Sequence, residues 1–228
     1  MNLNFIGDLF FPPACVGCGD SLPAGVICDA CLRGIDRFDT LFCGTCAARL
    51  PEQKKICHKD APYMLGAAGA YDDEPLRALI HALKFQGMTA AAEPLAKILA
   101  EYIKRLDLDL AEYIVTPIPL STQRARARGF NQSALIAKPF ADALGLPFEE
   151  RLLSRILHRK PQSDTEDIFE RRENIKGCFA PAPGADVQNK KIVLVDDVTT
   201  SGTTFAEAAR VLRSAGAKKI FALAVAKA

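Results

Sequence analysis

The sequence predicts an α/β protein in which a parallel sheet flanked by helices follows a small cysteine-rich domain. Short apolar runs rich in β-branched residues alternate with segments of helical periodicity, a pattern typical of parallel strands that helices cover on both faces. Seven of the eight cysteines lie before residue 60, and the rest of the 228-residue chain is long enough to bury a substantial core. We therefore expect a zinc-ribbon domain over residues 1–62 and an α/β domain over residues 63–228.

The composition limits the classes of protein to consider. Charged residues make up 25% of the chain, hydrophobic residues 49%, and the formal net charge is +2, so the sequence lacks the basicity of a dedicated nucleic-acid-binding domain. No segment reaches the ~18 apolar residues of a membrane span, and the N-terminus lacks a secretory signal, so we expect a cytoplasmic protein. The apolar side chains of residues 5–11 either contact a membrane surface or a partner, or pack against the protein's own domain.

The cysteines of the first domain occur mostly in pairs separated by two residues. Thiolates at this spacing are the usual ligands of zinc, and a reducing cytosol disfavours disulfides. A complete set of four thiolates, which predicts one structural zinc ion, is formed by Cys15, Cys18, Cys28 and Cys31. Because so short a segment has little core of its own, we expect it to fold when zinc binds.

A second set of metal ligands is incomplete. Cys43, Cys46 and Cys57 need a fourth ligand, for which His58 and Asp60 are the local candidates. A carboxylate is a poorer ligand than a thiolate for a soft metal, so the sequence leaves a second zinc ion open. The spacing also leaves open a crossed arrangement in which the first pair joins the third.

Helical periodicity begins after a run of small residues. Residues 66–71 are small and flexible enough to link the two domains, and residues 75–85 and 90–106 then repeat apolar positions with the spacing of amphipathic helices. Lys84 lies near the end of the first of these helices. It either reaches an anionic ligand or stays in solvent, where it interacts favourably with the helix dipole, and we expect the latter.

An anion site is predicted after the buried strand at residues 113–120. The turn that follows carries Arg124, Arg126 and Arg128 and ends at Gly129, and helical periodicity resumes at residue 135. A strand, a basic turn and a helix N-terminus together bind anions, and this turn carries enough charge for pyrophosphate. Alternating arginines can instead form a solvated face, but their position at the carboxyl end of a parallel strand favours binding.

Residues 152–179 carry mixed charges without a long apolar run. We expect a mobile connection or hairpin that closes over a reactive centre, although the same composition suits a solvated loop. Cys178 in this segment is expected to be a small buried side chain. Residues 219–226 form the last predicted strand, so any hood over an acceptor has to come from the N-terminal ribbon and helices.

The most informative stretch covers residues 191–204. Residues 192–195 form a buried strand, and Asp196 and Asp197 follow it, where they can accept hydrogen bonds from two adjacent sugar hydroxyls. The next turn opens onto a helix from residue 205, whose N-terminus favours a phosphate. The turn consists of Thr199, Thr200, Ser201, Gly202, Thr203 and Thr204. It has neither the lysine of a Walker A loop nor three dinucleotide-binding glycines, and a helix cap would need only one such hydroxyl, so we predict a ribose-phosphate site.

The order of these features resembles that of the ComF/GntX family. After the cysteine pairs come Leu-Lys-Phe-Gln-Gly at 83–87, Pro-Ile-Pro-Leu at 117–120, Arg-Gly-Phe-Asn-Gln at 128–132 and a phosphoribosyl pyrophosphate (PRPP) motif at 195–204. The resemblance implies a type I phosphoribosyltransferase fold, PRPP bound with Mg²⁺, and a role in competence, the uptake and processing of transforming DNA. It implies catalytic roles for Asp196 and Asp197, and PRPP binding by the hydroxyl turn with Arg124, Arg128 and Gly129.

The chain departs from the family pattern in two places. Its middle segment contains Gln162, Arg171 and Asn174 but lacks the usual threonine before the glutamine, and the fourth cysteine pair is half missing. These departures concern the flap over the site and the second zinc ion, and they leave the first zinc ion and the PRPP motif intact.

Two functions are compatible with the sequence. One is a Mg²⁺-dependent phosphoribosyltransferase with an unidentified acceptor. The other is a non-catalytic module that responds to PRPP or a nucleotide and binds single-stranded DNA through its arginines and ribbon, with DNA-uptake and recombination proteins as partners. A two-metal hydrolase built on Asp196 and Asp197 is disfavoured because adjacent residues of a strand point in different directions.

Overall fold

The computed structural model describes residues 13–51, 57–58, 61–156 and 175–228. The helices in these ranges are α2 (Asp29–Gly34), α3 (Glu74–Phe85), the 3-10 helix η1 (Thr89–Ala91), α4 (Ala92–Arg105), α5 (Thr122–Arg128), α6 (Gln132–Leu144) and α8 (Thr203–Ser214). The strands are β1 (Phe42–Cys43), β2 (Met64–Ala70), β3 (Tyr113–Pro117), β4 (Leu153–Arg155), β5 (Phe179–Pro181), β6 (Lys191–Thr199) and β7 (Lys219–Lys227).

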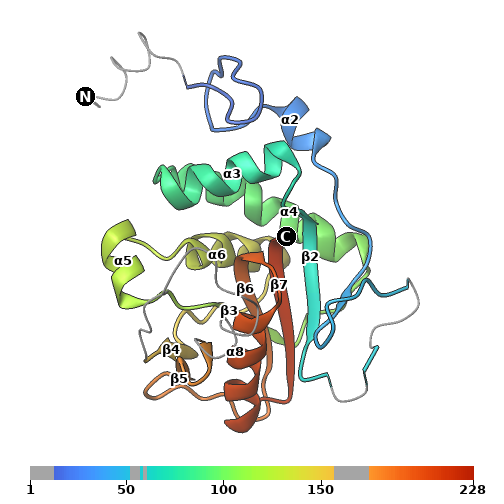
Figure 1. The fold of residues 1–228 in the computed structure, drawn as a ribbon, viewed down its shortest axis with the longest axis vertical. Helices are drawn as coiled ribbons and strands as arrows, with labels where there is room; N and C mark the ends of the chain where they lie inside the picture. The colour runs from blue at the N-terminus through green and yellow to red at the C-terminus, as the bar shows by residue number, and fades with distance from the viewer. Residues whose placement is uncertain (1–12, 52–56, 59–60, 157–174) are drawn as a thin grey trace.

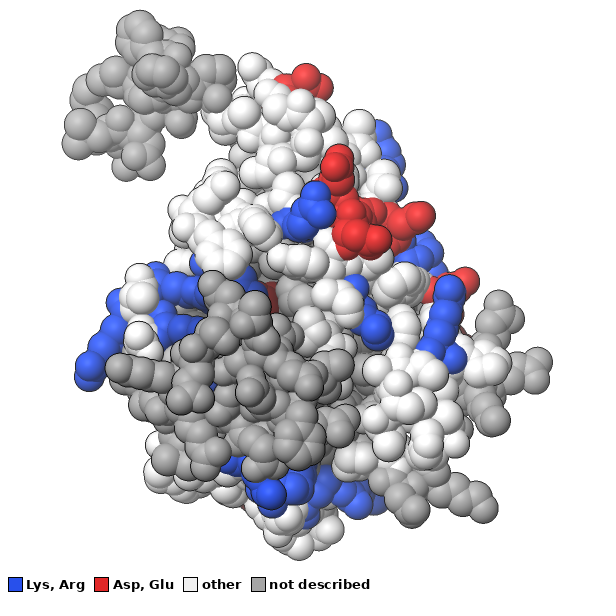
Figure 2. Space-filling model, viewed as in Figure 1, with Lys and Arg blue, Asp and Glu red and all other residues white. Residues whose placement is uncertain are grey.

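The main sheet has the strand order β1-β2-β7-β6-β3. Strands β2, β7, β6 and β3 are parallel, and β1 adds one antiparallel edge. The carboxyl ends of the parallel strands therefore meet at one edge, which is the upper edge in Figure 1, with α3 and α5 beside it. In the same view, Lys and Arg side chains gather where α5 lies (Figure 2). The parallel sheet predicted from the sequence is confirmed.

Helices cover both faces of this sheet, as the apolar strands predict. In β6, Val193 and Val195 belong to the hydrophobic cluster that includes α3, α4 and α6, whereas Ile192 and Leu194 belong to the cluster that includes α8. This alternation follows from the two-residue period of a strand. All four side chains are fully buried, which explains why the run has no polar position before Asp196.

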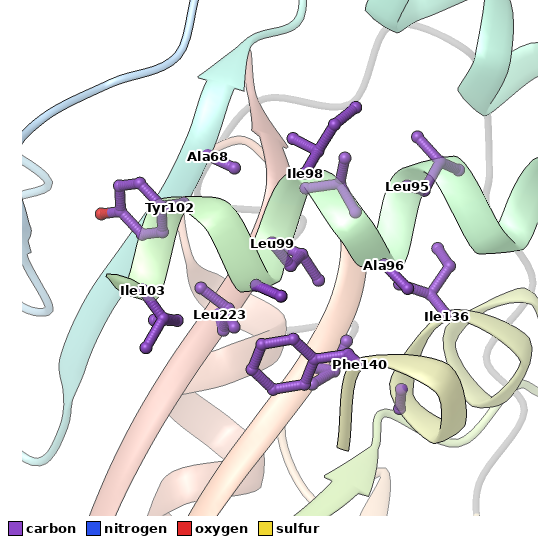
Figure 3. Close-up of a cluster of buried hydrophobic side chains, with 14 of the residues drawn as sticks. Ala68, Leu95, Ala96, Ile98, Leu99, Tyr102, Ile103, Ile136, Phe140 and Leu223 are labelled. Atoms are coloured by element: carbon purple, nitrogen blue, oxygen red, sulfur yellow. The ribbon is translucent and has the colours of Figure 1, made fainter. Parts of the chain in front are cut away.

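Helix α4 supplies much of one layer. Its apolar stripe faces α6 and the sheet, and Leu99, Phe140 of α6 and Leu223 of β7 lie together in the resulting core (Figure 3). Tyr102 is also fully buried, and its hydroxyl donates a hydrogen bond to the carbonyl oxygen of Thr40 at 2.6 Å. The cysteine-rich domain is thus joined to the core of the α/β domain.

The run of small residues at 66–71 is not the flexible link that we expected. Most of it belongs to β2, which is buried and pairs with β7. A Cβ atom on Gly66 would lie 2.9 Å from Phe221 Cζ and 3.0 Å from Tyr102 Cε1. The small side chains are therefore required by close packing, which is the other common reason for glycine in a strand.

The cysteine-rich domain contacts the α/β domain in two ways. Its first part lies beside α3, and together with α4 and α6 it lines an apolar cavity of about 540 Å³, whose wall includes Val26, Leu32 and Ala100. Its second part contributes β1, which extends the main sheet. In the described parts of the chain, no helix is both long and apolar enough to cross a membrane.

Candidate phosphosugar site and zinc centres

Asp196 and Asp197 lie near the carboxyl end of strand β6, at the edge where the parallel strands end. Asp197 is only 3% exposed, and its Oδ1 accepts a hydrogen bond from the amide of Val198 at 2.8 Å. Asp196 is partly exposed, and its Oδ1 accepts hydrogen bonds from Ser133 Oγ at 2.7 Å and from the amide of Asp197 at 2.9 Å. Both carboxylates are thus held in fixed orientations before any ligand binds.

Lys84 forms an ion pair with the buried carboxylate. Its Nζ lies 3.0 Å from Asp197 Oδ2, and the lysine side chain is 23% exposed. The expectation of a solvated lysine at the end of α3 is therefore wrong. A partly buried carboxylate favours the ammonium more than the helix dipole does, because the attraction is stronger where water is excluded. Only the family motif at residues 83–87 hinted at this residue.

The carboxylate of Asp196 has fewer favourable interactions to offset the cost of its burial. Burial, and next the charge of Asp197, raise the pKa of Asp196 from 3.8 to about 7, while the hydrogen bond from Ser133 and the charge of Lys84 act in the opposite direction. Two carboxylates here share one nearby ammonium. A bound cation or hydrogen-bond donor would therefore stabilise the two carboxylates. Groups with strongly shifted pKa values are concentrated at functional sites.

The hydroxyl turn follows directly and bends into α8. Gly202 is the N-cap of α8 and has a φ of 73°, a left-handed conformation that favours glycine. Ser201 Oγ and Thr203 Oγ1 lie 2.6 Å apart and share a hydrogen bond, Thr200 is exposed, and Thr204 is partly exposed. Thr199 differs from the others because it ends β6 and is only 4% exposed. The structure places the turn beside the Asp pair, at a helix N-terminus suited to a phosphate.

Tyr63 holds the turn from the side of the cysteine-rich domain. Its hydroxyl donates a hydrogen bond to the carbonyl oxygen of Gly202 at 3.2 Å, and a Cβ atom on Gly202 would lie 2.9 Å from that hydroxyl. At its other end, Tyr63 packs against Gly44, where a Cβ atom would lie 2.4 Å from the Tyr63 carbonyl oxygen. One buried residue therefore connects the segment between Cys43 and Cys46 to the candidate phosphate turn.

The three arginines lie on a helix rather than in the predicted turn. Ser121 caps α5 by accepting a hydrogen bond from the amide of Arg124 at 3.2 Å, and Gly129 ends it in the left-handed conformation. Alternating arginine and alanine are good helix formers, which the short basic pattern concealed. On a helix, Arg124 and Arg128 share one face and Arg126 points elsewhere.

Arg128 lies near the Asp pair, because it and Lys84, the ion-pair partner of Asp197, are both close to the ring of Phe85. Burial lowers its pKa, while the charges of Asp197 and Asp196 act to raise it, which places the guanidinium within electrostatic reach of both carboxylates. Its Nη1 donates a hydrogen bond to Gln132 Oε1 at 3.0 Å, and its Cζ lies 5.6 Å from the centre of the Phe85 ring. The same helix face carries Arg124, which is exposed.

The predicted flap is described only at its two arms. Strands β4 and β5 form an antiparallel pair, as a hairpin requires, and Gln162, Arg171 and Asn174 lie outside the described residues. Burial lowers the pKa of Arg155 in β4, and the charge of Asp196 acts on it in the opposite direction. The arms therefore bring a further cation towards the site. Cys178 is fully buried, as expected.

The cysteine-rich domain contains two groups of potential metal ligands. The first ligand set is Cys15, Cys18, Cys28 and Cys31, and the second ligand set is Cys43, Cys46, Cys57 and His58; within each set the ligand atoms lie within 4.8 Å of one another. Cys43 Sγ is 3.3 Å from His58 Nδ1. This arrangement excludes the crossed pairing and supplies His58 as the fourth ligand, while Asp60 lies outside the described residues.

The chemistry of both sets suits zinc. Burial alone would raise the pKa of Cys15, but backbone amide hydrogen bonds, chiefly from Cys28, lower it to about 6. The pKa of Cys43 is also about 6, because amide hydrogen bonds, chiefly from Cys46, outweigh burial. Other thiols shift the opposite way: the hydrogen bond with Cys28 raises the pKa of Cys31 to about 12, and burial raises the pKa of Cys57. Four ligands so close together are all held as thiolates only beside a cation, and zinc supplies that charge.

Comparisons with known protein families match two separate parts of the chain. A family model described as the phosphoribosyl transferase domain matches residues 131–228, and one described as the double zinc ribbon domain matches residues 6–60. The first match covers β6, the hydroxyl turn and α8, and the second covers both ligand sets.

Two curated relatives match most of the chain, and a third matches less than half of it. Competence protein F of Haemophilus influenzae is 29% identical over 231 residues, covering 96% of this chain and 99% of the relative. The DNA utilization protein YhgH of Salmonella typhimurium is 30% identical over 202 residues, covering 85% and 87%. Competence protein ComFC of Bacillus subtilis is 31% identical over 104 residues, covering 46% and 40%.

Solved structures with similarity are phosphoribosyltransferases and a related amidotransferase. Adenine phosphoribosyltransferase of Thermoanaerobacter pseudethanolicus is 16% identical with a TM-score of 0.37, and 78% of this chain and 94% of that chain are covered. Glutamine PRPP amidotransferase of B. subtilis is 23% identical with a TM-score of 0.41, covering 60% of this chain but only 26% of the longer amidotransferase chain.

Proposed function

The chain belongs to the ComF family, together with competence protein F and DNA utilization protein YhgH, and on that premise we propose that it binds PRPP with Mg²⁺ and transfers the phosphoribosyl group to an acceptor in DNA uptake or utilization. One observation supports this proposal above the others. The Asp pair, the hydroxyl turn at the N-terminus of α8, and cations from α3 and α5 meet at one edge of the sheet.

Each part of this arrangement suits one part of PRPP. Asp196 and Asp197 accept hydrogen bonds from the two ribose hydroxyls, and the turn at residues 199–204 surrounds the 5′-phosphate with amide and hydroxyl donors. Arg124 and Arg128 lie on one face of α5 and bind the pyrophosphate by charge-assisted hydrogen bonds. Mg²⁺ prefers carboxylate and phosphate oxygens, which the Asp pair and PRPP offer, and it supplies positive charge to the leaving group.

The reaction is then mainly electrostatic. A nucleophilic atom of the acceptor forms a bond to ribose C1′ as the bond from C1′ to the pyrophosphate oxygen breaks, and the electron pair leaves with pyrophosphate. The acceptor loses its proton to water. Positive charge develops on the ribose in this step, and the fixed carboxylates of Asp196 and Asp197 stabilise it, while the arginines stabilise the departing anion.

Thermal shift with PRPP, with and without Mg²⁺, tests the binding step. The two faces of α5 supply a matched pair of variants. Arg128→Ala removes a charge that lies near the Asp pair and is expected to weaken PRPP binding about 10- to 150-fold, the range for hydrogen bonds to charged groups. Arg126→Ala removes the same charge from another face and is expected to leave the shift unchanged. Absence of any PRPP shift in the wild-type protein would refute the proposal.

Turnover is tested separately by pyrophosphate release. We expect release that requires an acceptor and Mg²⁺ and that is lost in Asp197→Asn, with circular dichroism confirming that the variant is folded. Binding of PRPP without release for any nucleobase or nucleic acid would leave the binding step standing and refute catalysis.

A second candidate is a non-catalytic module that binds single-stranded DNA. The exposed side chains of Arg124 and Arg126 on α5 favour it, because they present positive charge beyond the Asp pair. DNA affinity is then expected to fall steeply with salt, and to fall further in Arg124→Ala. Contact with DNA-uptake or recombination proteins belongs to the same proposal, and the N-terminal apolar residues proposed for membrane or partner contact lie outside the described residues.

A further inference from the structure

Phe85 is an apolar side chain at the protein surface. It is the last residue of α3, and its side chain is 65% exposed. Among the large hydrophobic residues that the structure describes, only Ile156 is comparably exposed, at 58%. A single exposed apolar side chain is common on protein surfaces, so the inference depends on the groups that surround the Phe85 ring.

Neighbouring side chains fix the orientation of the ring. His81, one helical turn earlier, meets Phe85 edge-to-face with ring centres 5.1 Å apart. His81 is in turn held by Tyr71, whose hydroxyl lies 2.9 Å from His81 Nε2. The ring of Phe85 is therefore oriented although most of its surface is open to solvent.

Two cations flank the ring. Lys84 Nζ lies 5.9 Å from the ring centre, and Arg128 Cζ lies 5.6 Å from it. Both distances fall within the range of cation–π attraction, and both leave most of the ring surface uncovered. The same two cations define the proposed PRPP site, because Lys84 pairs with Asp197 and Arg128 responds to the charges of Asp196 and Asp197. Phe85 thus lies at the rim of that site.

We infer that Phe85 is the stacking surface for the acceptor, and that the acceptor is a nucleobase. This inference rests on the proposed phosphoribosyl transfer. Nucleobases are flat and aromatic, and an exposed aromatic ring beside cations is how proteins bind them without relying on base-edge hydrogen bonds. The nearby lysine and arginine hold anionic phosphates next to the base. Both a free base and a base in a single strand offer this chemistry, so the test includes each.

The chain contains no tryptophan, which makes a sharp test available. Phe85→Trp places one fluorescent indole at the proposed stacking surface. Ser214→Trp is the control, because Ser214 is exposed and is the last residue of the 12-residue helix α8, whose opposite end lies at the site. In the presence of PRPP and Mg²⁺, we expect adenine or the oligonucleotide (dA)₆ to quench the Phe85→Trp fluorescence saturably. The control is expected to show only the linear quenching of a free indole.

The two ligands distinguish the source of the base. Saturable quenching by adenine identifies a free base, and saturable quenching by (dA)₆ alone identifies a base in a strand; either supports the inference. Saturation with neither, or equal quenching of the Ser214→Trp control, overturns it. Phe85→Ala and Phe85→Leu, measured by calorimetry with the quenching ligand, are both expected to bind it about 5- to 150-fold more weakly, because leucine restores apolar area without a π-face.

The same variants separate this inference from the proposed function. Phe85→Ala is expected to retain the PRPP thermal shift of the wild-type protein. A wild-type protein that shows no PRPP shift would refute the proposed function. A normal PRPP shift together with unchanged base affinity in Phe85→Ala would refute only the stacking role of Phe85.

Discussion

The two ligand sets of the cysteine-rich domain are chemically alike but are attached to the protein in different ways. The first ligand set belongs to a segment that lies beside α3 and, together with α4 and α6, lines an apolar cavity of about 540 Å³. The second includes Cys43 of β1, which pairs with β2 of the main sheet. From its neighbour Gly44, contact passes through Tyr63 to Gly202 of the hydroxyl turn. Two similar sets of metal ligands can therefore have different roles: the first stabilises a segment beside the α/β domain, and the second supports the candidate phosphate turn.

The largest difference is expected when each ligand set is broken in turn. Cys43→Ser and Cys15→Ser form a matched pair, because both thiols are 2% exposed. Metal analysis is expected to show zinc loss in both variants. PRPP affinity is expected to fall only in Cys43→Ser, by about 5- to 150-fold, the usual range of coupling between two sites. An equal loss of affinity in the two variants would break the comparison.

A second difference is expected at the glycines of the two parts, in stability rather than in PRPP affinity. In Gly44→Ala, the new Cβ atom would lie 2.4 Å from the Tyr63 carbonyl oxygen, so we expect a loss of about 1 to 3 kcal/mol in the free energy of unfolding. Gly34→Ala in α2 meets nothing within 4 Å and is expected to be neutral or slightly stabilising. Denaturant unfolding measures both, and similar values would show that the second part tolerates displacement as well as the first.

The site that the second ligand set supports is itself destabilised by charge. The pKa of Asp196 is about 7 in the folded protein and near 3.8 when unfolded, so between these values the folded state binds more protons and stability falls as pH rises. Asp196→Asn is expected to be more stable than wild type by about 1 to 3 kcal/mol at pH 8, allowing for partial exposure, and similar to wild type near pH 4. It is also expected to lose PRPP binding. Thermal unfolding across this pH range measures the effect, and a constant difference would contradict it.

The smallest effect is predicted for the hydroxyl group of Tyr63. Tyr63→Phe removes the hydrogen bond to Gly202 and is expected to reduce PRPP affinity by less than about tenfold, because a neutral hydrogen bond contributes about 0.5 to 1.5 kcal/mol. Tyr71→Phe, which removes a hydroxyl contact with His81 instead, is the control. Isothermal titration with PRPP distinguishes them, and a loss confined to Tyr71→Phe would show that the turn does not depend on Tyr63.

The parts of the site that the sequence predicted are those encoded locally. The Asp pair, the hydroxyl turn and the start of α8 are consecutive in the chain, so the strand-to-helix pattern places them together without knowledge of the fold. The first ligand set was likewise predicted from cysteine spacing, and His58 was one of two candidates that only the structure could separate.

The parts that sequence reasoning missed depend on distant partners. Lys84 was expected in solvent because the carboxylate that holds it is on β6, far along the chain. From the sequence alone, the glycines of β2 indicated a flexible segment. In the structure, Gly66 is required because Phe221 and Tyr102 leave no room for a Cβ atom. The basic segment of α5 was expected to form a turn because its three arginines lack an apolar stripe, and only its caps at Ser121 and Gly129 indicate a helix.

The pairing of β2 with β7 has a consequence for the order of folding. Met64 is in register with Phe221, so an interior strand pair of the sheet joins an early segment of the chain to the last described strand. During synthesis, the edge of β2 that pairs with β7 therefore stays unpaired until β7 has been made. Non-local pairing of this kind is slow and exposes unpaired strand edges. Strand β1 precedes β2 in the chain and pairs with its other edge, so it shields β2 on that side until β7 is made.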